Sequence, residues 1–140
     1  FRMEIFNDTI QAIPSIHYDT WQLLSTQLRI VSAGIRIGEI KGKDILPAHS
    51  LALSTALNKE AFTCAKVSWD DAIKYLKKEA LLLPAEIEKG YVLVCYQGFP
   101  VGFVKHLGNR ANNLYPQEWR IRTGYIPEQV LLLTDYQQKR

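Results

Sequence analysis

The stretch from Gly90 to Gly108 constrains the fold of this chain more than any other. It consists of two β-rich runs, GYVLVCYQG and FPVGFVKHLG, joined by a short turn at Gly98-Phe99-Pro100. Runs rich in Val, Tyr, Phe and Cys that are broken by a glycine-proline turn are typical of paired strands. The stretch therefore predicts a β-hairpin.

Residues 1–46 are predicted to form a small strand-rich unit. Residues 1–13 alternate polar and apolar side chains around a turn at Asn7-Asp8, which indicates a second hairpin. Residues 28–42 contain two β-rich runs broken at Ala33-Gly34. One or two helical turns are expected between these two regions.

Residues 47–140 are predicted to form a second unit. Its clearest helix is SWDDAIKYLKKE, where Ser68 can cap the first turn, aspartates open the helix and lysines close it. A helix from Pro47 to Asn58 and a strand FTCAKV are expected before it. After the hairpin, WRIR is predicted as a short strand and VLLL at 130–133 as a final apolar run.

The positive charge is concentrated in one stretch. Residues 100–125 carry four cations and one carboxylate, which accounts for the whole net charge of +3. The hydrophobic share of 47% and charged share of 22% are ordinary for a globular protein, so disorder is not expected. The apolar runs are far shorter than the about 20 residues that span a bilayer, and we expect a cytoplasmic protein with no membrane contact. The chain begins with Phe1 rather than Met, as an excised fragment would.

The sequence contains no motif for metal binding or for catalysis. Both cysteines, Cys64 and Cys95, lie in apolar strand-like runs, and we predict that they are reduced, buried and structural. Neither they nor the three histidines have the spacing of metal ligands, so no metal is expected. His49 is predicted to be a capping or partly buried residue rather than a catalytic base.

Aromatic and cationic side chains alternate between residues 91 and 125. Rings can stack on bases and cations can contact phosphates, so the pattern is compatible with nucleic-acid binding. Aromatic residues in strands are nevertheless mostly packed, and three are expected in the core: Tyr91, Phe103 and Trp119. Three cations fit phosphate contact and a solvated surface equally well: Lys105, Arg110 and Arg120.

Several short motifs follow one another in a fixed order: PAH at 47–49, GY at 90–91, GFP at 98–100, RANNLYP at 110–116 and WR at 119–120. Together they resemble the PUA-like domain that ends RNA cytosine-5 methyltransferases of the Nol/Nop/Sun family. The branch is that of the bacterial small-subunit ribosomal RNA methyltransferase F, and the resemblance covers roughly residues 30–122. It implies an α+β fold, a PUA-like mixed β pseudo-barrel with short helices, preceded here by the strand-rich unit.

The resemblance also implies a role in RNA binding. The parent enzyme would methylate carbon 5 of a cytosine in ribosomal or transfer RNA with S-adenosylmethionine. The glycine-rich turn that this cofactor requires is absent from the sequence, so cofactor and catalytic cysteines are expected in an upstream catalytic domain of the same protein. Seven residues of this chain would contact RNA: Lys105, Arg110, Asn112, Asn113, Tyr115, Arg120 and Arg122.

Two alternatives remain open at this point. The chain could dock on the catalytic domain without touching RNA, in which case an exposed apolar patch is expected. It could also be a small-ligand-binding PUA-like domain, which requires an enclosed pocket around Lys105 and Asn113.

Overall fold

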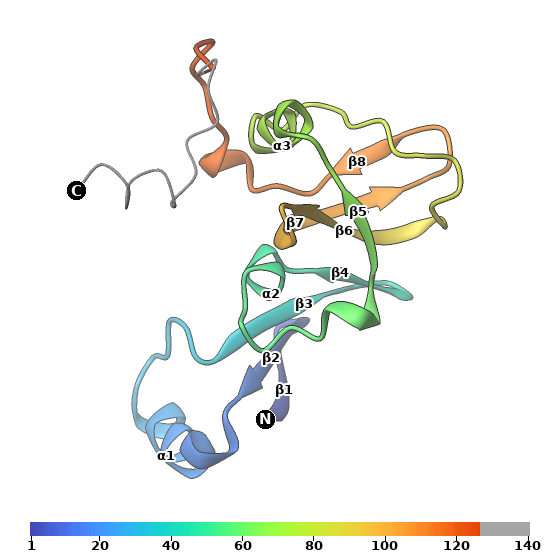
Figure 1. Ribbon diagram of the computed structural model, residues 1–140. Coiled ribbons are helices and arrows are strands. Elements are labelled where there is room, and N and C mark those ends of the chain that lie inside the picture. The colour runs from blue at the N-terminus through green and yellow to red at the C-terminus, as the bar shows by residue number, and fades with distance from the viewer. Residues whose placement is uncertain (127–140) are drawn as a thin grey trace, which may run out of the picture.

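The computed structural model describes residues 1–126 and contains two four-stranded sheets with a short helix between them (Figure 1). The strand orders are β1-β2-β3-β4 in the first sheet and β5-β6-β7-β8 in the second. This α+β architecture with few short helices confirms the predicted fold class. The predicted apolar run at 130–133 lies outside the described residues.

The first sheet is antiparallel throughout and is made of β1 (Arg2–Phe6), β2 (Thr9–Ile13), β3 (Ile35–Lys41) and β4 (Asp44–Pro47). Asn7 and Asp8 form the turn between β1 and β2, both with positive φ, which suits a two-residue hairpin loop and confirms the first hairpin. A 3₁₀ turn, η1 (Ser15–His17), and the helix α1 (Tyr18–Gln27) connect β2 to β3.

The first of the two β-rich runs predicted over 28–42 is not a strand. β2 pairs with β1 along one edge and with β3 along the other, so no edge of β2 is left for residues 28–34. Val31 in this segment is 93% exposed. Gly34 turns the chain into β3 with a φ of 61°, at a place where a Cβ would overlap the carbonyl of Ala12.

The second sheet is mixed. Its strands are β5 (Thr63–Lys66), β6 (Gly90–Tyr96), β7 (Phe99–His106) and β8 (Ala111–Asn113), and only the β5–β6 pair is parallel. The β6–β7 pair confirms the predicted hairpin, although its turn lies one residue earlier, at Gln97-Gly98. The helix α3 (Trp69–Leu76) connects β5 to β6, and Ser68 caps it by accepting a hydrogen bond from the amide of Asp71 at 3.2 Å.

Three other predicted boundaries are wrong. The helix expected from Pro47 to Asn58 comprises only α2 (His49–Ala52), because Pro47 belongs to β4. Asn58 instead caps the start of η2 (Lys59–Ala61) by accepting from the amide of Glu60. In place of a WRIR strand the chain forms η3 (Gln117–Trp119), and the three-residue β8 had no clear signal in the sequence.

The second sheet is covered on both faces, and the core lies there. Successive residues of β6 point to opposite sides. Val92 and Val94 pack with Tyr75 of α3, whereas Leu93 and Cys95 pack with Ala52 of α2. In Figure 1, α3 lies above this sheet, and α2 and the first sheet lie below it. No helix within residues 1–126 has both the length and the apolar character to cross a membrane.

Gly102 provides a test of this packing. It has a φ of 150°, and a Cβ there would overlap the hydroxyl of Tyr75, which is fully buried and donates to the carbonyl of Phe103 at 3.1 Å. We expect Gly102→Ala to lower the free energy of unfolding, measured in urea, by on the order of 3 kcal/mol, because backbone strain and overpacking add.

Two control substitutions separate these causes. Gly98→Ala places a methyl group in open space at a φ of 82° and should cost about 1 kcal/mol. Gly124→Ala, also in open space, should leave stability unchanged. Equal losses at Gly98 and Gly102 would show that the overlap with Tyr75 is unimportant.

Candidate functional site

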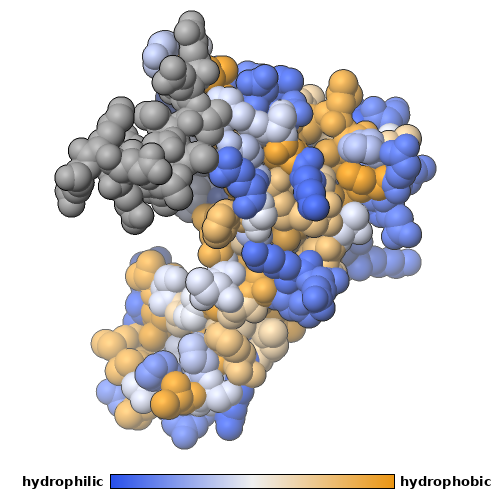
Figure 2. Space-filling model, in the orientation of Figure 1, coloured by the Kyte–Doolittle hydropathy of each residue, from blue (hydrophilic) through white to orange (hydrophobic). Residues whose placement is uncertain are grey.

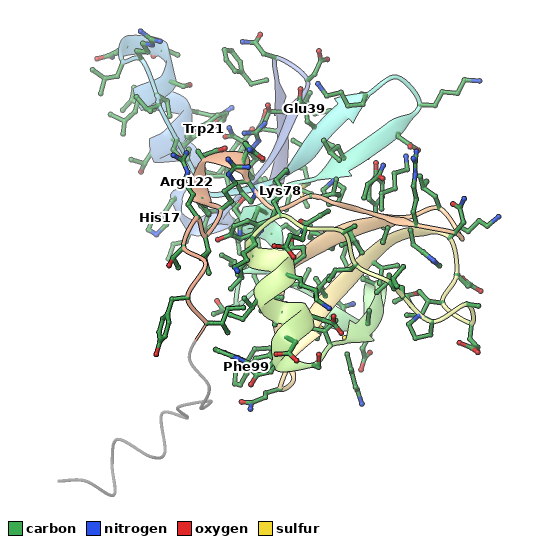
Figure 3. The ribbon with its side chains drawn as sticks, turned by 90° about the horizontal axis from the view of Figure 1, so that it is seen from above. His17, Trp21, Glu39, Lys78, Phe99 and Arg122 are labelled. Carbon is green, nitrogen blue, oxygen red and sulfur yellow. The ribbon has the colours of Figure 1, made fainter. Side chains whose placement is uncertain are left out.

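The cations predicted to contact RNA lie in two separate groups. Lys105 and Arg110 are at the end of β7 and in the turn into β8, on the right of Figure 1. Arg120 and Arg122 follow η3, after the chain has run back to the left. Figure 3 shows Arg122 well separated from the hairpin tip that carries Phe99.

Lys105 links the two sheets. Its ammonium group donates to the Asp44 carboxylate at 2.7 Å and lies 5.1 Å from the centre of the Tyr91 ring. The hydrogen bond to Asp44 raises the pKa of Lys105. An exposed pair of this kind contributes little to stability, but it partly neutralises the positive charge with which Lys105 would contact an RNA phosphate.

Arg120 and Arg122 share a concave surface with Lys77, and we call these three residues the basic cluster. The concavity has a volume of about 360 Å³ and also contains the carboxylate of Glu79. The amide of Ile121 donates to the carbonyl of Leu76 at 2.9 Å, which fixes this segment beside the end of α3. Three cations facing one carboxylate favour an anionic ligand.

Asn113 is committed to contacts within the chain. Its amide nitrogen donates to the carbonyls of Tyr75 and Glu79, each at 2.9 Å, and its side-chain oxygen accepts from the amide of Tyr115 at 2.9 Å. Its neighbour Asn112 is exposed on the other face of the sheet. We therefore leave Asn113 out of the contact set proposed below and keep Asn112.

Tyr115 also has a packing role. Its partly buried ring meets the rings of His49 and Tyr75 at centroid distances of 5.0 and 5.4 Å. Its backbone carbonyl accepts a hydrogen bond from the Lys78 ammonium group, which also donates to the carbonyl of Asn113. We leave Tyr115 out of the proposed contact set for this reason.

The alternative pocket around Lys105 and Asn113 is not formed. Lys105 is opposite Asn112 in the β7–β8 register, and Asn113 is opposite Val104. Neighbouring positions of a strand face opposite sides of the sheet. Lys105 and Asn113 therefore point away from each other and cannot line one pocket.

A second concavity lies where the two sheets meet, and we call it the junction pocket. It has a volume of about 300 Å³ and is lined by β3, by the segment from β4 into α2, and by residues 114–119. Its lining includes Arg36, Glu39, His49, Glu118 and Trp119. Sequence reasoning missed Arg36 and Glu39, because they meet the other residues only after the sheets pack together.

Trp119 and His49 form the aromatic part of this pocket. Their rings meet edge to face at 5.5 Å. Trp119 is 58% exposed, so its predicted core position is wrong: it ends a short 3₁₀ turn at the surface. Phe103, in contrast, is buried as predicted. His49 is partly buried, also as predicted, and this burial lowers its pKa.

The two cysteines differ from each other. Cys95 is buried as predicted, and burial raises the pKa of its thiol to about 12, so it stays protonated at neutral pH. Cys64 is exposed, contrary to the prediction, because β5 is an edge strand and its buried side chain is that of Ala65.

Residues 63–121 match the family described as Methyltransferase RsmF PUA domain. This range begins with β5 and ends just after η3, so it contains the whole second sheet and α3. This part of the chain is similar to an RsmF PUA domain. The predicted resemblance is thereby confirmed. The expected division of the chain at residues 46 and 47 stays a prediction.

Curated relatives of this chain carry the name ribosomal RNA small subunit methyltransferase F. The protein from Shewanella sp. (strain W3-18-1) is 29% identical over 112 residues, which cover 78% of this chain and 22% of the relative. Those from Enterobacter sp. (strain 638) and Klebsiella pneumoniae (strain 342) are 28% and 25% identical over 100 residues, 71% of this chain and 20% of each relative. The chain thus spans about a fifth of the length of these relatives.

The neighbours Asn112 and Asn113 of β8 form a matched pair for mutation. We expect Asn113→Ala to lower the free energy of unfolding by about 2 kcal/mol, because it leaves partly buried backbone groups without partners. Asn112→Ala should change it by less than about 0.5 kcal/mol. Chemical denaturation of both variants measures the difference, and an equally mild effect at both positions would contradict the structural role of Asn113.

His49 makes the stability depend on pH. Its folded-state pKa lies below the ordinary value of 6.5, so the unfolded chain binds a proton more readily. Its contribution is complete above pH 6.5 and is lost as the pH falls through the lowered pKa. Denaturation at several pH values should therefore show a smaller acid loss of stability in His49→Phe than in the wild type. Identical pH profiles would refute this assignment.

Proposed function

We propose that this chain is the RNA-binding C-terminal region of a ribosomal RNA methyltransferase. The observation that carries the proposal is the match of residues 63–121 to the RsmF PUA domain, together with relatives that are named ribosomal RNA small subunit methyltransferases. Because the chain spans about a fifth of those relatives, S-adenosylmethionine binding and methyl transfer to carbon 5 of a cytosine are assigned to the rest of such a protein. Within it, this chain holds and orients the RNA.

The basic cluster is the part of the chain best suited to hold an RNA backbone. Its three cations line one concavity, beside the end of α3. Guanidinium groups match phosphate geometry and are less strongly hydrated than ammonium groups. Lys105 and Arg110 lie at the other end of the sheet, and Asp44 partly neutralises Lys105. We therefore assign the main phosphate contacts to Lys77, Arg120 and Arg122, with weaker ones from Arg110 and Asn112.

The test is RNA binding across a salt series. The wild-type chain should bind structured ribosomal RNA with an affinity that falls as salt rises, because bound cations release counterions from the RNA. Removal of the basic cluster by Lys77→Ala, Arg120→Ala and Arg122→Ala should weaken binding and lower the slope of log affinity against log salt by about two. Fluorescence anisotropy with labelled RNA measures both quantities.

A matched control removes the same number of positive charges from another part of the surface. Arg29, Lys43 and Lys66 are exposed cations outside the basic cluster, and their replacement by alanine should leave the slope nearly unchanged. A second variant, Lys105→Ala with Arg110→Ala, should weaken binding less than loss of the basic cluster does. Equal effects of all three variants would show that binding follows net charge alone, and no binding at low salt would refute the proposal.

A second function, docking on the catalytic region, is favoured by the exposed apolar surface of the first sheet. β1 is an edge strand whose Met3, Ile5 and Phe6 are all more than 60% exposed, and α1 contains no buried residue. Natural proteins usually protect such an edge. We infer that the rest of the protein covers it, so that one chain both docks through its first sheet and binds RNA through its second.

The docking role is tested in the full-length protein. Met3→Glu with Ile5→Glu should lower the melting temperature of the full-length protein, because charges would be buried at the interface. In the isolated chain, where both side chains are exposed, the same change should have little effect. Equal shifts in both proteins, or none in the full-length protein, would contradict docking through β1.

A further inference from the structure

The junction pocket has a chemistry different from that of the basic cluster. Its lining combines apolar and aromatic residues, among them Leu46, Leu114 and Trp119, with several polar ones. Its volume of about 300 Å³ is at the lower end of the range for small-molecule sites, roughly 300–1,000 Å³. Such a pocket suits a small flat ring rather than an extended chain.

The charges of the pocket select against a phosphate. Glu39 and Glu118 line it together with a single cation, Arg36. His49 does not add a positive charge at neutral pH, because burial lowers its pKa. Two carboxylates facing one guanidinium repel an anion but accept hydrogen bonds from a neutral ligand. The concavity of the basic cluster has the opposite balance of charge, with three cations and one carboxylate.

Trp119 provides a surface on which a ring can stack. The His49 ring helps to hold the Trp119 ring in place. The two ring centroids lie 5.5 Å apart, with an interplanar angle of 79°. His49 is in turn packed against Tyr115 at 5.0 Å. With 58% of the residue exposed, Trp119 is available to a ligand, and base stacking on an aromatic side chain tolerates every base.

Glu39 provides a hydrogen-bond acceptor that can distinguish between bases. Lys41 donates a hydrogen bond to one of its oxygens, and the other lies 3.6 Å from the Arg36 guanidinium. The hydrogen bond from Lys41 lowers the pKa of Glu39, so the carboxylate stays ionised and can only accept. Adenine, cytosine and guanine carry an exocyclic amino group that can donate to it. Uracil lacks this group, and its ring N–H lies between two carbonyl oxygens that a carboxylate would repel.

We infer that the junction pocket receives one unpaired nucleobase with an exocyclic amino group, stacked on Trp119 with its amino group toward Glu39. Trp119 and Arg120 are consecutive, so the pocket adjoins the basic cluster, and the backbone of the same RNA strand continues onto the three cations. The inference rests on the proposed RNA binding and adds to it a base-reading site. Sequence-specific RNA recognition commonly reads unpaired bases in this way.

The first test follows the three tryptophans of the chain, Trp21, Trp69 and Trp119, through their indole N–H signals in NMR spectra. The ligands are short oligouridines and the same oligomers with the central base replaced by adenine, cytosine or guanine. All carry the same phosphates, so differences report the base alone. The amino-bearing oligomers should shift the Trp119 signal and bind about tenfold more tightly than oligouridine, with the Trp21 signal unmoved.

Variants identify the two contacts. Trp119→Ala should weaken binding of the amino-bearing oligomers about tenfold, and Trp119→Phe should restore most of the loss because it keeps a ring. Glu39→Gln should reduce the preference over oligouridine, whereas Glu60→Gln, a carboxylate in η2 outside the pocket, should leave it unchanged. Trp21→Ala in α1 is the control for loss of a tryptophan.

The outcomes separate this inference from the proposed function. RNA binding that depends on the basic cluster but is equal for all four oligomers, with no shift at Trp119, would overturn the base site and leave the RNA-binding proposal intact. Absence of RNA binding in the salt series would overturn both. A preference for uridine would also overturn the role of Glu39.

Discussion

The burial of both faces of the β6–β7 hairpin is the constraint on which the rest of the structure depends. Val92 and Val104 require a cover on one side, and Leu93 and Phe103 require one on the other. α3 supplies the first cover and α2 contributes to the second, with the first sheet beneath it. Because α2 contacts both β3 and β7, the same short helix sets how the two sheets are placed. His49, its first residue, is thereby placed against Tyr115 and Trp119.

The same core determines where the charged residues stand. Asn113 and Lys78 tie the chain after β8 to the end of α3 through hydrogen bonds to backbone carbonyls. The chain can then turn through η3 and run beside Leu76, which brings Arg120 and Arg122 next to Lys77. Figure 2 shows the hydrophilic residues distributed over several parts of this face rather than in one continuous band. The basic cluster therefore differs from the rest of the surface because three cations lie close together there, and not because the chain as a whole carries a high net charge.

Much of the fold could be predicted from the sequence, because local patterns determine it. The turn at Asn7-Asp8, the cap at Ser68 and the β6–β7 hairpin each have a signal within a few residues. The errors arise where long-range packing decides. Residues 28–34 find both edges of β2 occupied by β1 and β3, and Trp119 ends a surface turn instead of beginning a strand. The site was predictable only in part. Arg120 and Arg122 were predicted, but Lys77, Arg36 and Glu39 join the two concavities only through tertiary contacts.

The central claim is that RNA binds beside the end of α3, where residues 120–122 follow η3. The most direct measurement is the map of backbone amide shifts in NMR spectra as ribosomal RNA is added to the chain. We predict that the largest shifts occur at Lys77 and at residues 119–123, with smaller ones around the junction pocket and none along β1. Shifts that are confined to the first sheet, or that centre on the β7–β8 turn, would contradict it.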